Sequence, residues 1–203
     1  MGAQEWDERY SQAGYAYGSQ PNDWLREQSG RLKAGAELLC LAEGEGRNAV
    51  FLAAQGLRVT AVDQSAVGLA KARALATERG VAIETVTADL GDYDLGQARW
   101  DAIVSIWCHL PSALRGSLYG RVARALKPGG LFVLETYGPG QIALGTGGPK
   151  EPDLLGSQAR LQAELPGLDW LSAATLRRQV EEGGFHRGLS EVVQLLGRRP
   201  LEG

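Results

Sequence analysis

A glycine-rich stretch between residues 38 and 53 has the spacing of a nucleotide-binding loop. In "LLCLAEGEGRNAVFLA", Gly44 and Gly46 are followed by Ala49, which meets the pattern G-x-G-x-x-[G/A]. Glycines there let a ligand approach the backbone closely, and the helix that follows offers free N–H groups. Asp63 stands 17 residues after Gly46, where a carboxylate can accept hydrogen bonds from both hydroxyls of a ribose. These spacings suit NAD and other ligands that contain adenosine.

Two glutamates inside this loop distinguish between those ligands. Glu43 and Glu45 would repel a pyrophosphate. S-adenosylmethionine instead carries a sulfonium and an ammonium, which a carboxylate a few Å away stabilises by roughly 1–4 kcal/mol, depending on the local dielectric. Its own carboxylate could meet Arg47, or the N–H groups at the start of the helix beside Asn48. We therefore predict S-adenosylmethionine as the cofactor, with Glu43, Arg47 and Asn48 at its methionyl end.

Short apolar runs alternate with helical stretches from residue 36 onward, and this alternation places the loop at the edge of a sheet. Five runs are expected to be strands: "AELLCLA", "RVTAVD", "VAIETVTADL", "DAIVSIWC" and "LFVLETY". Helices are expected over residues 47–55, 66–80 and 111–126. The alternation favours right-handed βαβ crossovers and a parallel sheet with helices on both faces. Ligands of such sheets bind beyond the carboxyl ends of the strands, where the glycine-rich loop would lie.

The two ends of the chain differ from this cofactor-binding core, which spans residues 36–137. Residues 1–35 are rich in aromatic residues and predict two short helices that form a lid. Residues 138–168 are rich in Gly and Pro, with one helix expected over 153–164, and we interpret this insertion as a substrate-side loop. Residues 169–203 predict two strands joined by a glycine-containing turn, a hairpin that can add antiparallel edge strands. We expect all of these segments to form a single domain.

Composition and charge argue against several classes of protein. The net charge is −3 and no basic run occurs, which argues against nucleic acid or an anionic membrane as a partner. No segment approaches the ~20 consecutive apolar residues of a membrane span, and the polar N-terminus does not resemble a secretory signal. Cys40 and Cys108 fall in apolar runs, as expected for buried thiols in a reducing cytoplasm. With two histidines in the chain, no metal site is expected. We expect a cytoplasmic protein, a monomer or weak dimer, that acts on a small molecule.

Six motifs resemble those of the class I S-adenosylmethionine-dependent methyltransferases. They are "WDERY…YAYGSQPNDWL", "LAEGEGRNAVFLA", "VTAVDQS", "ADL", "IVSIWCHLP" and "LKPGGLFVLETY", within a resemblance that extends from Trp6 to Arg199. In detail the chain resembles the bacterial tellurite-resistance methyltransferases, near the thiopurine methyltransferases. The resemblance implies a Rossmann-like, doubly wound α/β fold: a mostly parallel seven-stranded sheet with an antiparallel C-terminal hairpin.

The resemblance also implies which residues contact each part of the cofactor. They are Gly44 and Gly46 for the methionyl part, Asp63 for the ribose, Gln64 against the adenine, and Asp89 with Leu90 for the adenine amino group and ring face. The family loop usually reads D-x-G-x-G-x-G, whereas here Cys40 replaces the Asp and Ala42 the first glycine. Glu43 is the candidate to take over the role of that Asp.

The acceptor is expected to lie at the end of the fourth strand, in "SIWCHLP". Methyl transfer from a sulfonium is an in-line displacement, so the protein must hold the nucleophile about 3–3.5 Å from the methyl group. Thiolates and selenium anions need no strong base, whereas oxygen and nitrogen acceptors more often do, with His as the commonest choice. Trp107 and His109 are the best-placed side chains. His109 is either a general base or a part of the pocket wall.

Other aromatic residues could complete an acceptor pocket. Trp6, Tyr10 and Tyr17 either form a lid or pack the N-terminal helices onto the sheet. Tyr137, just past the fifth strand, is a further candidate, and Arg9 could recognise an anionic acceptor. The predicted function is methyl transfer from S-adenosylmethionine to a small chalcogen oxyanion, thiol or other soft nucleophile. Two alternatives remain open: a nicotinamide-dependent oxidoreductase, and a protein that binds S-adenosylmethionine without catalysis.

Overall fold

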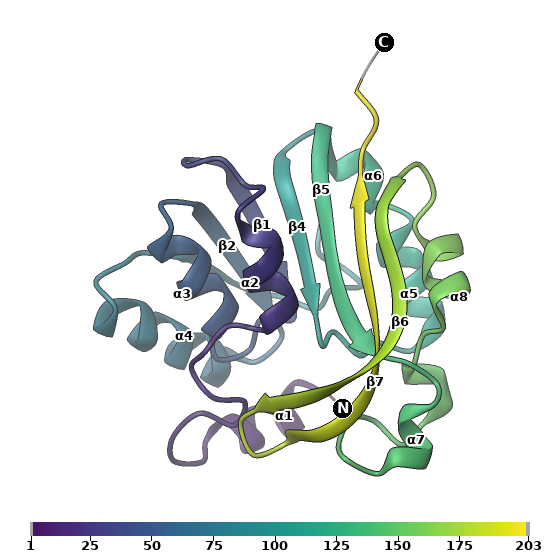
Figure 1. Ribbon diagram of the computed structural model, residues 1–203. Coiled ribbons are helices and arrows are strands. Elements are labelled where there is room, and N and C mark those ends of the chain that lie inside the picture. The colour runs from purple at the N-terminus through teal and green to yellow at the C-terminus, as the bar shows by residue number, and fades with distance from the viewer. Residues whose placement is uncertain (1, 202–203) are drawn as a thin grey trace.

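A computed structural model, which describes residues 2–201, shows one seven-stranded sheet with helices on both faces (Figure 1). The strands are β1 (Glu37–Leu41), β2 (Arg58–Asp63), β3 (Glu84–Thr87), β4 (Trp100–Ile106), β5 (Leu126–Tyr137), β6 (Asp169–Glu182) and β7 (His186–Arg198). The helices are α1 (Ala3–Tyr10), α2 (Asp23–Ser29), α3 (Arg47–Ala54), α4 (Ala66–Glu78), α5 (Ser112–Tyr119), α6 (Val122–Ala125), α7 (Gln141–Leu144) and α8 (Gln158–Glu164), with a 3-10 turn, η1 (Pro152–Leu154).

The strands lie in the order β3-β2-β1-β4-β5-β7-β6. The first five pair in parallel, and β7 pairs antiparallel with both β5 and β6. The chain winds from β1 outward to β3 and then returns to β4 on the other side of β1. The strand order therefore reverses between β1 and β4, and a ligand of this fold binds outside the carboxyl ends at that point. The predicted doubly wound sheet with a terminal hairpin is confirmed.

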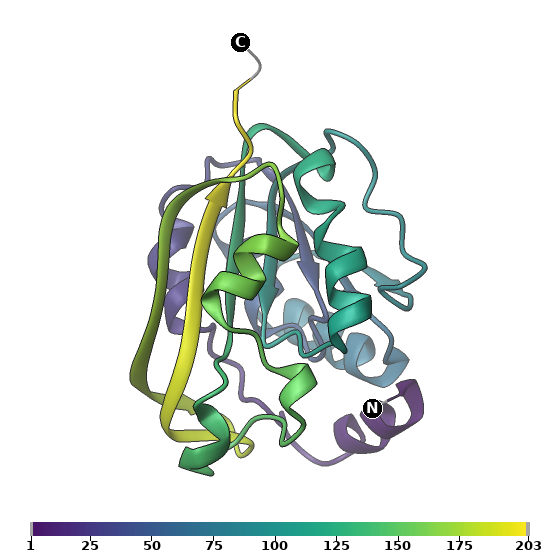
Figure 2. The same cartoon turned by 90° about the vertical axis from the view of Figure 1, so that its right-hand side faces the viewer.

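The central strands are buried on both faces, with alternate side chains in different core clusters. Leu39 and Leu41 of β1 pack in a cluster with residues of α5, α6 and α8. Leu38 and Cys40 pack in another with residues of α2, α3 and α4. Because strand side chains alternate in direction, these clusters place the two groups of helices on opposite faces of the sheet. Figure 2 shows the sheet from the side with helices flanking it.

Several element boundaries differ from the sequence prediction. The single helix expected over 111–126 is two helices, α5 and α6, because α5 ends at its C-cap Gly120, a residue that disfavours continuation. The predicted third strand is shorter, Glu84–Thr87. The insertion at 138–168 holds α7 and η1 as well as α8, whereas one helix was expected. None of the helices in residues 2–201 has the length and apolar character that crossing a membrane requires.

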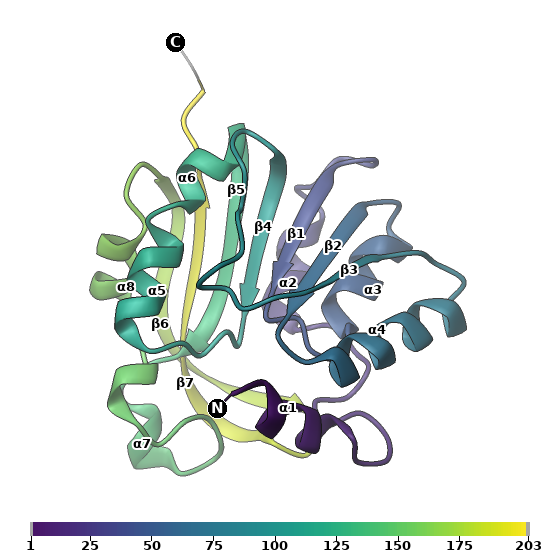
Figure 3. The ribbon, with the colours of Figure 1, turned by 180° about the vertical axis from the view of Figure 1, so that it is seen from behind.

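The N-terminal segment closes over the carboxyl edge of the sheet. Asp7 of α1 accepts a hydrogen bond from Ser65 Oγ at 2.5 Å and another from the Val67 N–H at 3.3 Å, at the start of α4. Lys71 of α4 donates to the carbonyl oxygens of Gln12 and Gly14, at 2.8 and 2.6 Å. Figure 3 shows α1 between α4 and the end of the β6–β7 hairpin. The two predicted N-terminal helices are therefore present, and α1 is held against the edge where the ligand is expected.

Candidate active site

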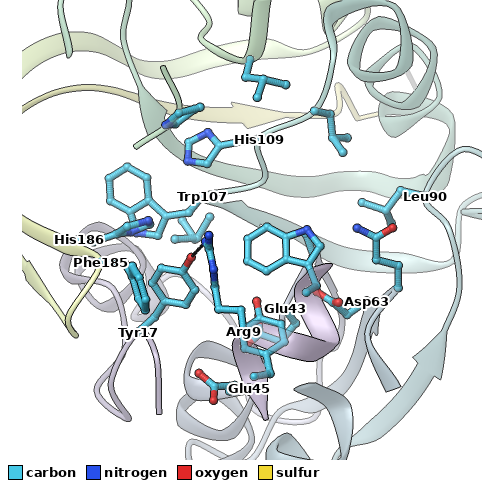
Figure 4. Close-up of a pocket in the computed structure, with 18 of the residues that line it drawn as sticks. Arg9, Tyr17, Glu43, Glu45, Asp63, Leu90, Trp107, His109, Phe185 and His186 are labelled. Carbon is cyan, nitrogen blue, oxygen red and sulfur yellow. Dashed lines mark hydrogen bonds between the residues drawn. The ribbon is translucent and has the colours of Figure 1, made fainter. Parts of the chain in front are cut away.

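A cavity of about 750 Å³ opens at the carboxyl ends of the parallel strands, between them, α1 and the β6–β7 turn. Its size lies within the range of about 300–1,000 Å³ typical of small-molecule sites. Figure 4 shows Asp63 and Leu90 on one side of this pocket, and Trp107, His109 and His186 on the other. Every residue predicted for the site lines the cavity except Gly44, Gly46 and Tyr137. The site predicted from sequence is therefore one continuous space.

The predicted adenosine side of the cavity is polar with an apolar patch. Asp63, at the end of β2, accepts hydrogen bonds from the Gly44 N–H at 2.9 Å and the Ser65 N–H at 2.8 Å. Asp63 is 5% exposed, and its burial raises the pKa of the carboxyl above its usual range. Asp89 is exposed and accepts from the Gly91 N–H at 2.7 Å, while Leu90 beside it is buried. Carboxylates and an apolar side chain suit the hydroxyls and the ring of an adenosine.

Gly44 and Gly46 allow close packing within the protein, a role that the sequence did not predict. A Cβ at Gly44 would lie 2.5 Å from Tyr10 Oη, and a Cβ at Gly46 would lie 2.5 Å from the Cβ of Ala72. Both residues also have positive φ, +61° and +86°. Their lack of a side chain thus lets Tyr10 cover the loop and lets α3 pack closely on α4. Neither residue lines the cavity, and their contact with the methionyl part of the cofactor stays a prediction.

Glu43 caps the helix that follows the loop. Its Oε1 accepts hydrogen bonds from the backbone N–H groups of Asn48 and Ala49, at 2.9 and 2.8 Å. Burial raises its pKa to about 7, against the lowering effect of those N–H groups and of Arg47. Cys40 lies next to Glu43, and burial together with that carboxylate raises the pKa of the thiol. The free helix N–H groups that we expected to meet a cofactor carboxylate therefore already bind Glu43.

Glu45 and Arg47 are also engaged within the protein. Glu45 accepts from the Ala16 N–H at 2.7 Å and pairs with Lys71 at 2.9 Å, so it ties the N-terminal segment to α4. Arg47 pairs with Glu182 at 2.5 Å. Arg47, which we expected to bind the cofactor carboxylate, lines the cavity but already has this acidic partner. The charge of Glu45 is likewise balanced by Lys71 rather than directed at a ligand.

Glu182, which the sequence analysis did not single out, joins four elements behind the cavity wall. It accepts hydrogen bonds from Arg47 at 2.5 Å, from Trp107 Nε1 at 2.5 Å, from Asn22 Nδ2 at 2.8 Å and from Arg178 Nη2 at 3.0 Å. Burial alone would raise the pKa of this carboxyl, but Arg47 and these donors lower it to about 2. Glu182 is therefore an anion that fixes Trp107 and Arg47 in place.

The predicted acceptor side of the cavity is aromatic. Trp107 has a left-handed backbone, φ +54°, and its ring lies 4.8 Å from that of His186 and 6.2 Å from that of His109. His109 Nδ1 lies 3.3 Å from Thr136 Oγ1, and its Nε2 is buried with no hydrogen-bond partner in residues 2–201. Burial and the nearby Arg115 lower the pKa of His109 to about 4. The imidazole is therefore neutral at pH 7 and can accept a proton.

The cavity differs from the predicted acceptor pocket at two residues, Tyr137 and His186. Tyr137 is fully buried and does not line the cavity; it lies behind the wall, 4.4 Å from the Trp107 ring and stacked on His109 at 5.5 Å. His186, which sequence reasoning missed, does line it, and burial lowers its pKa to about 3. No local sequence signal marked His186, because only the fold brings the hairpin turn that precedes it to the carboxyl edge.

Comparisons with known proteins agree with this fold. Residues 38–130 match the family model described as a methyltransferase domain. No curated protein matches the sequence. A structure concerned with the conversion of a disulfide bond into a thioacetal group during echinomycin biosynthesis is 18% identical, with a TM-score of 0.77, and the match covers 99% of this chain and 93% of that one.

Two further structures are also similar to this chain. An S-adenosylmethionine-dependent methyltransferase from Methanosarcina mazei is 16% identical, with a TM-score of 0.69, over 90% of this chain and 100% of that one. TehB from Haemophilus influenzae is 15% identical, with a TM-score of 0.72, over 97% of this chain and 66% of that one. At these identities the structural matches establish the Rossmann-like methyltransferase fold.

The matched domain, on this fold, defines the class of the protein. It is an S-adenosylmethionine-dependent methyltransferase, and S-adenosylmethionine is its cofactor. The cavity fits that cofactor, because acidic and apolar residues at the ends of β2 and β3 face aromatic residues at the end of β4 across a space of suitable volume. These findings favour a methyltransferase over the nicotinamide-dependent alternative.

Proposed function

We propose that this enzyme methylates a small soft nucleophile, a thiol or a chalcogen oxyanion, bound against Trp107, His109 and His186. The observation that supports this most directly is the division of the cavity. Its carboxylate side lies at the ends of β2 and β3, and its aromatic side lies at the end of β4. A cofactor that spans from one side toward the other would present its methyl group to an acceptor on the aromatic side.

In this proposal Asp63, Gln64, Asp89 and Leu90 hold the adenosine part of the cofactor. S-adenosylmethionine supplies an activated methyl group on a sulfonium. The chain's own residues then have to orient the acceptor and exclude water, since an in-line displacement depends mainly on positioning. Tyr10 and Tyr17 close one side of the cavity, and the fixed indole of Trp107 forms a flat wall on the other.

His109 is the proposed proton acceptor. Burial lowers its pKa to about 4, so the imidazole is neutral over the physiological range and its lone pair can accept a hydrogen bond, or a proton, from an acidic acceptor such as a thiol. A soft acceptor is favoured because such a weak base does not suit an alcohol or an amine, whereas thiols ionise readily. The disulfide-to-thioacetal conversion named for one similar structure, and the resemblance to tellurite-resistance enzymes, support sulfur or another chalcogen as the acceptor atom.

A mass-spectrometric screen tests the proposal. The enzyme is incubated with S-adenosylmethionine and, separately, with tellurite, selenite, thiols, amines and phenols, and methylated products are counted. Methylation restricted to thiols and chalcogen oxyanions supports the proposal, and methylation of amines or phenols alone contradicts it.

The two buried free cysteines, Cys40 and Cys108, also lead us to propose a reducing cytoplasm as the location.

A further inference from the structure

Arg9 of α1 lies at the cavity beside two aromatic rings, those of Trp6 and Phe185. Its guanidinium carbon lies 5.0 Å from the ring centroid of Trp6 and 4.9 Å from that of Phe185. Its Nη1 donates to Tyr17 Oη at 2.8 Å, a bond that Figure 4 shows. All four side chains line the cavity. The guanidinium is therefore positioned by neighbours from α1, the following loop and the hairpin turn, and none of them carries a negative charge.

No carboxylate within residues 2–201 forms an ion pair with Arg9. Glu8, the acid next to it in the chain, accepts a hydrogen bond from Gln4, and Asp7 is bonded to Ser65 and to the start of α4. Arg9 is only partly exposed, and a cation without a counter-charge loses solvation when it is covered. Such an arrangement is more favourable when a ligand supplies the missing anion.

Arg47, the other cationic side chain that lines the cavity, does have an acidic partner. Arg47 pairs with Glu182 at 2.5 Å and is buried. The N–H groups of Asn48 and Ala49, a second possible anion site, bind Glu43. Among the described residues that line the cavity, Arg9 is thus the Arg or Lys side chain without an acidic partner. An anionic group in the cavity would therefore be attracted to the guanidinium of Arg9.

We propose that Arg9 and Tyr17 form an oxyanion-binding subsite for a planar group such as a carboxylate. This inference rests on the proposed methyl transfer, which brings two candidate carriers to the cavity: the cofactor, through its methionine carboxylate, and an anionic acceptor. A guanidinium presents its N–H groups along its edge in a fork that matches two oxygens. The guanidinium carbon lies over the rings of Trp6 and Phe185, which position the group at the cavity. Tyr17 fixes the rotation of the fork by accepting from Nη1.

Calorimetry with Arg9→Gln tests the cofactor as carrier. The ligands are S-adenosylhomocysteine and its decarboxylated analogue, which differ in that one carboxylate. If the methionine carboxylate occupies the subsite, Arg9→Gln weakens S-adenosylhomocysteine by about 10- to 100-fold and leaves the analogue unchanged, as expected for lost hydrogen bonds to a charged group. Tyr17→Phe should weaken the same ligand by a smaller factor. Arg26→Gln, on α2 outside the cavity, is the control.

A second titration tests the acceptor as carrier. With S-adenosylhomocysteine bound, 3-mercaptopropionate and the neutral 2-mercaptoethanol are titrated into wild type and Arg9→Gln. A charged acceptor in the subsite makes the wild type prefer 3-mercaptopropionate, and Arg9→Gln removes the preference.

The inference is overturned if Arg9→Gln changes neither the affinity for S-adenosylhomocysteine nor the preference between the thiols. It is also overturned if the charged and neutral ligands weaken equally, since Arg9 would then only hold α1 in place. A wild type that binds no S-adenosylhomocysteine at all would instead refute the proposed function. Circular dichroism of each variant confirms that the fold is intact.

Discussion

The indole N–H of Trp107 donates to Glu182 Oε2 at 2.5 Å, which links the end of β4 to a residue 75 positions later in the chain. The same carboxylate oxygen binds Arg47 of α3 at 2.5 Å. One buried anion thus holds both a wall of the cavity and the helix that follows the glycine-rich loop. The C-terminal hairpin, which carries Glu182, is therefore part of the site and not only an addition to the sheet.

Glu182→Gln should lower the free energy of unfolding by about 3 kcal/mol, because it leaves the buried Arg47 without its anion. Urea denaturation at pH 7 measures the change. Glu181→Gln, the exposed neighbour on the same strand, is the matched control and should change stability by less than about 0.5 kcal/mol. Equal stability of the two variants would show that Glu182 does not hold these elements together.

Asp63→Ala should weaken the binding of S-adenosylhomocysteine by about 1–3 kcal/mol, through the loss of charge-assisted hydrogen bonds. Because Asp63 also accepts from the Gly44 and Ser65 N–H groups, Asp63→Asn is needed beside it to preserve the shape of the loop. Calorimetry on both variants, with the exposed Asp92→Ala as control, gives the affinities. Unchanged affinity in both would refute the ribose assignment.

Glu43→Gln should change the dependence of stability on pH. The folded-state pKa of Glu43 is about 7, above the ordinary value of 4.5, so the folded protein binds this proton more tightly than the unfolded chain. The stabilisation that protonated Glu43 provides is complete below pH 4.5 and is lost as pH rises through 7. Wild type should therefore lose stability relative to Glu43→Gln between pH 5 and 8 in urea denaturation. A constant difference between the two proteins would mean that Glu43 titrates normally.

The same variant separates two roles for Glu43 in ligand binding. Glu43 caps α3, so it influences ligand binding only indirectly, through the position of that helix. Glu43→Gln should therefore change the affinities for S-adenosylmethionine, S-adenosylhomocysteine and adenosine by similar factors. A loss confined to the two ligands with a methionyl group would show that Glu43 faces their ammonium or sulfonium instead. Calorimetry with the three ligands distinguishes these outcomes.

His109→Gln should lower kcat by at least about 10²-fold if His109 accepts the proton, and leave the affinity for S-adenosylhomocysteine unchanged. Because burial places the pKa of His109 near 4, wild-type kcat should fall only as the pH drops toward 4, where the imidazole becomes charged. Rates across pH 4–8 with a thiol acceptor provide the test. An unaltered kcat in His109→Gln would restrict this residue to the pocket wall.

Local sequence patterns predicted the site residues that lie at the end of a single strand or the start of a single helix. Asp63 closes a strand, Ser65 caps the next helix through the Gly68 N–H, and His109 follows the fourth strand. The parallel pairing of the first five strands then follows from the alternation of strands and helices. The cavity wall at these strand ends was therefore largely predictable.

Contacts between distant segments could not be predicted in this way. Glu182 and His186 lie in a hairpin whose sequence gives no sign that its turn reaches the carboxyl edge. The two loop glutamates looked like ligand groups, yet Glu43 caps α3 and Glu45 pairs with Lys71. A local pattern shows that a charge is present but not which partner the fold brings to it. The charges of Glu43 and Glu45 led us to predict the right cofactor, yet both carboxylates have partners within the protein.

Calorimetry with S-adenosylhomocysteine and, separately, NADH tests the central claim most directly. Wild type should bind S-adenosylhomocysteine with one-to-one stoichiometry and show no heat of binding with NADH. Binding of NADH without binding of S-adenosylhomocysteine would contradict it.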